Sequence, residues 1–163
     1  TYFPHVIEPS FGLGRILYAL LEHSYDVRKN DEQRKFLRLP PQISPYQLGL
    51  FTVVNNIDFE NVLEKLKTKA LLKYNMNIQV DTSRASIGKK YSRWDETGLP
   101  YVISIDSETV GDNETDKEQT VTIRERDSTA QIKVSLDSAV DIVADLITER
   151  YTWDDVTKKY PIM

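Results

Sequence analysis

Residues 48–54 form a nearly continuous apolar run, Leu-Gly-Leu-Phe-Thr-Val-Val, in a chain of 163 residues. An apolar run without polar alternation is typical of a strand that is buried on both faces. Such a strand lies in a sheet that carries helices on both sides, because each face must be covered by apolar side chains. The run therefore indicates an α/β fold.

The periodicity of residues 47–163 predicts the order β-α-β-α-β-β-β-α. Apolar positions at helical spacing predict helices over residues 59–70, 84–97, 139–147 and 153–159. Alternating or continuous apolar positions predict further strands over residues 76–80, 101–106, 121–126 and 131–134. Asp58 is expected to cap the first helix, and residues 112–118 to form an acidic loop. We expect a mixed, mostly parallel five-stranded sheet flanked by about three helices, with right-handed crossovers between the parallel strands.

Two shorter parts precede this unit. Residues 1–25 predict a short strand at 3–7, a tight glycine turn and a helix, and residues 26–46 are polar and proline-bearing, which predicts a connector. The chain begins at Thr1 without an initiator Met and runs directly into apolar sequence. We therefore expect a chain that is cut inside a folded unit.

Composition excludes several classes of function. The chain has no cysteine and only two histidines, so disulfides, thiolate sites and a histidine-rich metal cluster are excluded, and no metal site is predicted. No apolar run approaches the ~20 residues that span a bilayer, so no membrane partner is expected. The net charge of −4 excludes a basic surface over the whole chain, and it leaves a local cluster at Arg84, Lys89, Lys90 and Arg93. That cluster is also compatible with an ordinary solvated helix face.

A first motif lies at residues 8–15. Gly12 and Gly14 permit a tight turn and the close approach of a ligand, and Arg15 can present its planar guanidinium to a phosphate. The alternative is a common strand-to-helix turn whose arginine meets only solvent. The spacing matches neither the P-loop nor the dinucleotide-binding glycine pattern.

The run Glu8-Pro9-Ser10-Phe11-Gly12-Leu13-Gly14-Arg15 resembles motif 3 of class II aminoacyl-tRNA synthetases, in the form found in eukaryotic and archaeal glycyl-tRNA synthetases. The resemblance implies that residues 1–25 are the end of a catalytic domain. It implies that Arg15 contacts ATP as a catalytic residue, beside Gly12 and Gly14, and that Glu8 and Ser10 help to form a glycine pocket. ATP with Mg²⁺ is then the cofactor of the parent enzyme, and no tightly bound cofactor is expected in this chain.

A second motif combines cations, aromatic rings and acids over residues 86–101 and 120–131. Recognition of single-stranded RNA needs these ingredients, although ion pairs across strands and core aromatics would give the same composition. Both segments resemble the anticodon-binding domain that follows motif 3 in glycyl-tRNA synthetases. The resemblance implies that residues 47–163 form such a domain and that glycine tRNA is its partner.

Glycine anticodons end in two cytosines, and the cytosine N4 amino group is a donor that carboxylates accept. The candidate N4 acceptors are Glu96, Glu125 and Asp127, and the candidate donors to the base are Arg124, Arg126 and Gln131. The candidate phosphate contacts are Lys89, Lys90 and Arg93, and Tyr91 or Trp94 is a candidate stacking ring.

The function implied by both resemblances is that of the carboxy-terminal part of a glycine–tRNA ligase, a homodimer that activates glycine with ATP and transfers it to tRNA. The chain alone is expected to be inactive, because motifs 1 and 2 would lie upstream. The resemblance places the parent in the cytoplasm, with the mitochondrion as a further possibility. Two alternatives remain. One is a non-catalytic RNA- or protein-binding module of the same fold, and the other is an α/β domain that binds a small molecule at its strand ends.

Overall fold

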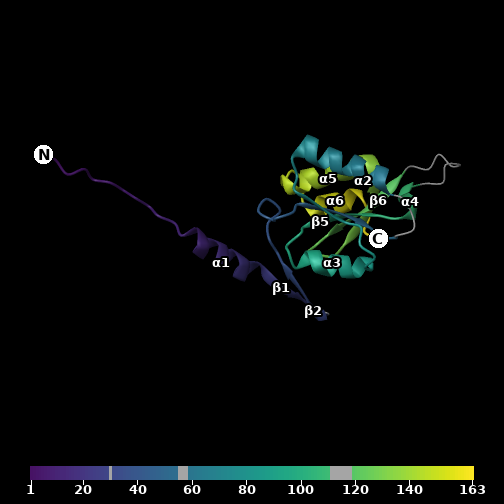
Figure 1. Cartoon of the computed structure of the whole chain (residues 1–163), viewed down its shortest axis with the longest axis horizontal. Coiled ribbons are helices and arrows are strands. Elements are labelled where there is room, and N and C mark those ends of the chain that lie inside the picture. The colour runs from purple at the N-terminus through teal and green to yellow at the C-terminus, as the bar shows by residue number, and fades with distance from the viewer. Residues whose placement is uncertain (30, 55–58, 111–118) are drawn as a thin grey trace.

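The sheet at the centre of this computed structural model has five strands in the order β4-β3-β5-β6-β7 (Figure 1). The structure describes residues 1–29, 31–54, 59–110 and 119–163. The strands are β3 (Leu48–Thr52), β4 (Ile78–Asp81), β5 (Tyr101–Ile105), β6 (Thr120–Glu125) and β7 (Gln131–Ser135). β3 pairs in parallel with β4 and β5, whereas β6 is antiparallel to β5 and β7. The mixed five-stranded sheet is therefore confirmed, with β6 alone opposing the direction of the other four strands.

Helices cover both faces of the sheet (Figure 1). One face carries α2 (Glu60–Thr68), its π-helical continuation η1 (Lys69–Lys73), α5 (Leu136–Ile147) and α6 (Trp153–Lys159). The other face carries α3 (Ile87–Asp95). A single turn, α4 (Ser107–Val110), follows β5. The crossovers β3-α2-β4 and β4-α3-β5 thus place one helix on each side of the parallel strands.

The central strand β3 contributes side chains to both cores. Leu48 and Leu50 belong to the larger cluster under α2 and α5, and Phe51 belongs to the smaller cluster under α3. All five residues of β3 are buried. Burial of an aliphatic or aromatic side chain contributes about 1.5–3 kcal/mol, so this strand is a principal source of the stability of the domain. The expectation of a strand buried on both faces is confirmed.

Helix boundaries follow local chemistry. α6 begins with a capping box in which the Thr152 hydroxyl accepts from the Asp155 amide at 3.2 Å and the Asp155 carboxylate accepts from the Thr152 amide at 3.2 Å. The turn after α3 contains Gly98 at φ +85°, which is the conformation expected for a glycine that follows a helix. The expected Asp58 cap and the acidic loop over residues 112–118 lie outside the described residues.

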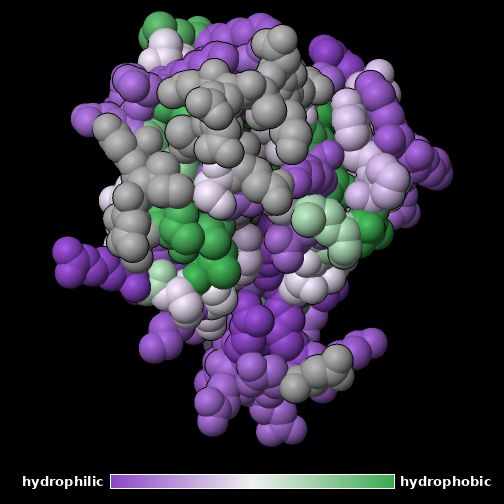
Figure 2. Space-filling model, turned by 90° about the vertical axis from the view of Figure 1, so that its right-hand side faces the viewer, coloured by the Kyte–Doolittle hydropathy of each residue, from purple (hydrophilic) through white to green (hydrophobic). Residues whose placement is uncertain are grey.

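The amino-terminal part differs from expectation in two ways. Residues 1–12 contain no regular element, so the strand predicted at 3–7 is absent, since no neighbouring strand pairs with it in the part of the chain that the structure describes. Helix α1 (Leu13–Ser24) is present and projects away from the body of the domain (Figure 1). The predicted connector contains an antiparallel hairpin of β1 (Tyr25–Arg28) and β2 (Asp31–Leu37). All but one of the side chains in its two strands are exposed or half-buried, and among the described residues of the hairpin only Phe36 is fully buried. The hairpin accordingly forms a mostly hydrophilic projection at the bottom of Figure 2.

Candidate nucleic-acid interface

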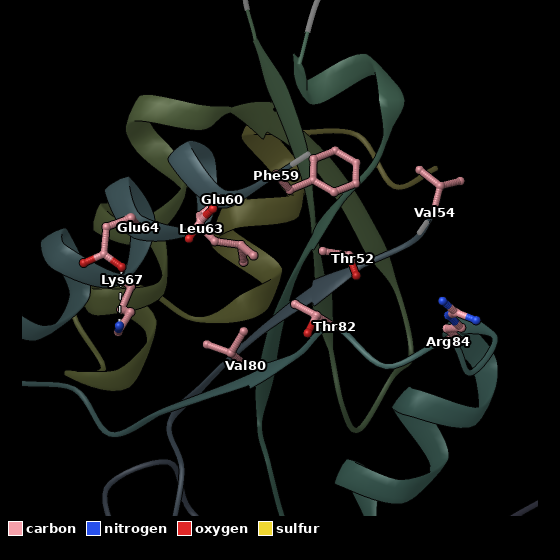
Figure 3. Close-up of a pocket in the computed structure, with 10 residues that line it drawn as sticks. All are labelled: Thr52, Val54, Phe59, Glu60, Leu63, Glu64, Lys67, Val80, Thr82 and Arg84. Carbon is pink, nitrogen blue, oxygen red and sulfur yellow. Dashed lines mark hydrogen bonds and ion pairs between the residues drawn. The ribbon is translucent and has the colours of Figure 1, made fainter. Parts of the chain in front are cut away.

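A cavity of about 530 Å³ opens where the parallel strands β3 and β4 end, beside α2 (Figure 3). Its apolar wall consists of Val54, Phe59, Leu63 and Val80. The hydroxyls of Thr52 and Thr82 add polar atoms at the strand ends. The carboxyl ends of parallel strands are the usual binding edge of an α/β sheet, so the fold itself favours a ligand here.

Charged side chains of both signs surround this wall. Figure 3 shows Arg84 on one side, in the turn before α3, and Glu64 and Lys67 on the opposite side, on α2. Glu60 precedes Glu64 by one helical turn and also lines the cavity. Convergent donors and acceptors around an apolar wall suit a flat polar ring such as a nucleobase.

Lys90 lies beneath the cavity rather than on its surface. Its side chain is completely buried, and Nζ donates to the carbonyl oxygens of Thr52 at 2.8 Å and Asp81 at 3.1 Å. Burial lowers the pKa of the Lys90 ammonium, and the nearby Asp81 carboxylate opposes that shift. Lys90 therefore fastens two strand ends together, and its side chain does not face a phosphate in this structure.

The Asp81 carboxylate organises the turn that leads to Arg84. It accepts from the Ser83 amide at 3.0 Å, from Trp94 Nε1 at 2.9 Å and from Arg93 Nη1 at 3.3 Å. Burial would raise the pKa of Asp81, but the hydrogen bonds from Ser83 and Trp94 outweigh it and the pKa is lowered. The carboxylate is thus held ionised, which fixes the β4–α3 turn at the cavity rim.

The exposed face of α3 carries three of the predicted contacts. Lys89, Arg93 and Glu96 follow one another at intervals of four and three residues, so they lie on one side of the helix. Glu96 is the residue that follows α3, and all three side chains are exposed. Trp94 is half-buried against Tyr46, with ring centroids 5.8 Å apart, and Tyr91 is buried. The rings are therefore part of the packing under α3, while the cations and the carboxylate of this face meet solvent.

Arg124 and Arg126 point into the protein. Arg124 is 3% exposed and binds both carboxylate oxygens of Asp95 at 2.9 Å each. Arg126 is equally buried and donates to the carbonyl oxygens of Leu39 at 3.0 Å and Gly98 at 2.8 Å. The guanidinium groups predicted to donate to a cytosine base therefore donate to groups within the protein instead.

The turn between β6 and β7 engages the remaining predicted residues. The Glu125 carboxylate accepts from the amides of Asp127 at 2.8 Å and Ser128 at 2.6 Å. The Asp127 carboxylate lies 2.7 Å from Arg126 Nε. Gln131 opens β7 opposite Arg124, and it is half-buried. The tRNA contacts assigned to these side chains stay a prediction, and an RNA base would have to displace the bonds that Glu125 makes in this turn.

The sheet register separates the predicted residues into two groups. Thr52, at the cavity, pairs with Ile105 at the end of β5. Glu125 pairs with Tyr101, which is the first residue of β5. The β6–β7 turn therefore lies at the end of the sheet opposite the cavity. Helix α3 runs between these two ends, with Lys89 nearer the cavity and Glu96 nearer the turn.

Comparison with protein families decides what kind of domain this is. Residues 50–146, more than half of the chain, match the family model described as "Anticodon binding domain". The chain belongs to this family. The match covers β3 from Leu50 onward, the cavity, all of α3 and the β6–β7 turn, so the anticodon-binding domain includes both ends of the sheet.

Several proteins named as glycine--tRNA ligases are similar to nearly the whole chain. A "Glycine--tRNA ligase" of Drosophila melanogaster is 43% identical over 161 residues, which are 99% of this chain and 20% of the relative. Two proteins of Saccharomyces cerevisiae, "Glycine--tRNA ligase 2" and "Glycine--tRNA ligase 1, mitochondrial", are 40% and 38% identical over 96% of this chain, and 24% and 22% of their own lengths. These matches confirm the resemblance to glycyl-tRNA synthetases. The chain spans about a fifth to a quarter of the length of these relatives.

The cavity residues are those that sequence reasoning does not single out. The sequence places Arg84 in the cationic cluster without a site, and it marks Phe59, Glu60 and Glu64 only as parts of a helix. The signal that could have found them is positional, because residues just after parallel strands line the binding edge of such sheets. In the anticodon-binding domain that signal applies to Thr52 and Thr82 as well.

The first motif lies outside the matched residues. Glu8, Ser10, Gly14 and Arg15 are exposed, and the structure does not gather them into a pocket within the described chain. Gly12 caps α1 through its carbonyl oxygen, which accepts from the Arg15 amide at 3.0 Å. The described residues also contain no group of three or more histidines or acids that could hold a metal ion, and no helix among them is long and apolar enough to cross a membrane.

Proposed function

We propose that this chain is the carboxy-terminal part of a glycine–tRNA ligase and that it binds the anticodon of glycine tRNA. The observation that carries the proposal is the family match over residues 50–146, which includes a cavity of a size and polarity suited to a base. Its support from sequence is the similarity of nearly the whole chain to proteins named glycine--tRNA ligase. Because the chain is a small share of those relatives, the ligase activity is proposed for a longer parent.

An unstacked anticodon cytosine occupies the cavity in this proposal. The Arg84 guanidinium donates to the N3 and O2 acceptors of the base, and Glu60 and Glu64 on the facing helix accept from its N4 amino group. The apolar wall around Phe59 and Val80 covers the base faces. The base-reading role is thereby moved from the buried Arg124 and Arg126 to residues that already border open space.

The phosphate backbone then runs along the exposed face of α3. Lys89 and Arg93 lie on that face, next to the turn that carries Arg84. Glu96 lies at the far end of the same face, where its carboxylate bounds the cationic part. Cations at this spacing give affinity without base preference, because they meet phosphates rather than base edges. Lys90 supports this surface from within, since it joins the strands on which the cavity is built.

Titration of fluorescent glycine tRNA with this chain tests the proposal. Replacing the anticodon cytosine that occupies the cavity by uracil should weaken binding about tenfold or more, since one good base contact is worth about 1–3 kcal/mol. Arg84→Gln should lose most of that discrimination, whereas Arg150→Gln, which changes an exposed arginine beyond α5, should retain it. Equal affinity of the unaltered chain for both anticodons would refute anticodon recognition and favour a non-specific RNA- or protein-binding module.

In the same proposal, the first motif belongs to the active site of the parent ligase. Arg15 contacts ATP, which binds with Mg²⁺, and Glu8 and Ser10 border the glycine pocket once the upstream catalytic domain surrounds them. The parent acts as a homodimer in the cytoplasm, the mitochondrion or both, and the isolated chain is inactive. In a full-length ligase, Arg15→Ala should abolish glycine-dependent ATP–pyrophosphate exchange and leave anticodon binding unchanged. Exchange at the unaltered rate would contradict the role given to Arg15.

A further inference from the structure

The carboxylate of Asp95, at the end of α3, forms ion pairs with arginines from three different strands. Arg124 from β6 binds both of its oxygens at 2.9 Å, and Arg28 from β1 binds Oδ2 at 2.9 Å. Arg34 from β2 approaches the same oxygen at 3.9 Å. The Asp95 side chain is only 4% exposed, so these contacts form in a desolvated junction between the hairpin and the domain.

Arg28 makes further bonds across the same junction. Its guanidinium donates to the carbonyl oxygens of Arg126 at 2.5 Å and Asp127 at 2.8 Å. The same guanidinium lies 3.9 Å from the centre of the Phe36 ring, which is the buried side chain of β2. One arginine of the hairpin therefore holds α3, the β6–β7 turn and the partner strand at once.

The hairpin continues directly from α1. Ser24 is the last residue of the helix and Tyr25 the first of β1, so no linker residue separates the two elements. The Arg38 amide, just beyond β2, donates to the Ser24 carbonyl oxygen at 2.6 Å and closes the base of the hairpin. Figure 1 shows α1 continuing the line of the hairpin away from the domain. A rotation of the hairpin must therefore rotate α1.

A two-stranded hairpin has little stability of its own. Among its described residues the only fully buried side chain is Phe36, so its orientation depends on what holds it to the domain. The charged junction provides that hold with directional bonds. The planar Arg28 guanidinium bonds with both terminal nitrogens, Nη2 to Asp95 Oδ2 and Nη1 to the Asp127 carbonyl oxygen. Such a rigid fork restricts orientation more than apolar packing does.

We propose that Asp95 is a positioning residue that sets the direction of α1, which carries Arg15, relative to the surface that receives tRNA. The proposal rests on the proposed function, since that function gives α1 and α3 their roles. Asp95 suits the task because it lies on the helix whose exposed face carries Lys89 and Arg93. The Asp95 carboxylate thus transmits a force that tRNA exerts on α3 to the hairpin, and anticodon binding is coupled to the orientation of the catalytic segment.

Distance measurement between two spin labels tests the junction directly. The chain has no cysteine, so Tyr18→Cys on α1 and Leu72→Cys on η1, both at exposed residues, provide two unique labelling sites. The unaltered junction should give a single narrow distance distribution. Arg28→Met should broaden it at least twofold while the circular dichroism of the domain persists, and Arg150→Met should not. An equally narrow distribution in Arg28→Met would overturn the proposal, and this variant serves where Asp95→Asn fails to fold.

Kinetics of a full-length ligase that contains this sequence distinguish positioning from simple structural support. Arg28→Met should lower kcat for aminoacylation about tenfold, with KM for tRNA within about twofold and with tRNA-independent ATP–pyrophosphate exchange unchanged. An unchanged kcat, or an equal loss of exchange activity, would overturn the positioning role. Failure of the proposed function appears separately, as indifference of the unaltered chain to the anticodon cytosines.

Discussion

Lys90 reaches from α3 to the last residue of β3, where its Nζ atom lies 2.8 Å from the carbonyl oxygen of Thr52. The same ammonium binds the carbonyl oxygen of Asp81 at 3.1 Å, at the end of the neighbouring strand. Two parallel strands that share a binding edge are thus joined by one buried charge. Its neighbour Lys89 is exposed, so adjacent lysines of one motif have different roles.

The first prediction concerns this pair of lysines. Lys90→Met should destabilise the chain by about 2–4 kcal/mol, because two buried carbonyl oxygens lose their donor. Lys89→Met should change the free energy of unfolding by less than about 0.5 kcal/mol, since its side chain is exposed. Urea denaturation of both variants measures the difference. Equal stability of the two variants would show that the buried ammonium does not hold the strand ends.

The second prediction concerns the salt dependence of RNA binding. Lys89→Met should weaken binding to cognate and cytosine-substituted anticodons by the same factor, because a phosphate contact reads no sequence. It should also reduce the slope of log K against log salt concentration by about 0.7, the value for one contact to a single strand. Titrations at several salt concentrations give both quantities. A selective loss for the cognate anticodon would instead place Lys89 at a base edge.

Much of the fold could be predicted from the sequence because its period is unambiguous. The apolar run at residues 48–54 indicated a strand buried on both faces, and all residues of β3 are buried. Helical spacing located α5, whose inner face contributes Ala139, Val140 and Val143 to the core. The hairpin could not be found in this way. Its side chains are exposed or half-buried except for Phe36, so no period of apolar residues marks its strands, and its orientation depends on Asp95, which lies in α3.

The residues of the site could not be predicted for a different reason. A cation or carboxylate in a sequence has no direction, and only the fold shows whether it faces solvent or the interior. Arg124 and Lys90 belong to the expected motif, yet the structure buries both with intramolecular partners. The cavity combines the ends of two strands with one face of α2, and these segments become neighbours only through parallel pairing. Arg84 gains its position at the rim from that pairing.

The third prediction concerns acid stability through Asp141 on α5. Burial would raise its pKa, but hydrogen bonds from Tyr74, Lys69 and Lys73 outweigh burial and lower the pKa to about 2. In the unfolded chain the value is about 3.9, so the carboxylate stabilises the fold above pH ~4 and loses that contribution as the pH falls through about 2. Because the side chain is 39% exposed, solvent screening limits the contribution to about 1 kcal/mol.

Unfolding of the unaltered chain and of Asp141→Asn as a function of pH measures this contribution. The difference in stability should be constant near neutral pH and should shrink between about pH 4 and pH 2, where the unaltered carboxylate becomes protonated. Asp154→Asn on α6 is a control, because the residue is exposed and belongs to no such cluster of lysines in the described bonds. A difference that stayed constant down to pH 2 would contradict the ionic origin of the effect.

The fourth prediction compares two glycines of the same motif. Gly98 has φ +85°, and a Cβ atom there would lie 2.7 Å from Leu39 Cδ1, so Gly98→Ala meets both backbone strain and a clash with a buried side chain. We expect a loss of about 1–3 kcal/mol. Gly88 lies in the first turn of α3, where an added Cβ atom would meet no other atom within 4 Å, and Gly88→Ala should stabilise the chain by about 0.5–1 kcal/mol. Thermal or urea unfolding decides the sign of each change. Stabilisation by Gly98→Ala, or destabilisation by Gly88→Ala, would contradict the constraint assigned to the corresponding position.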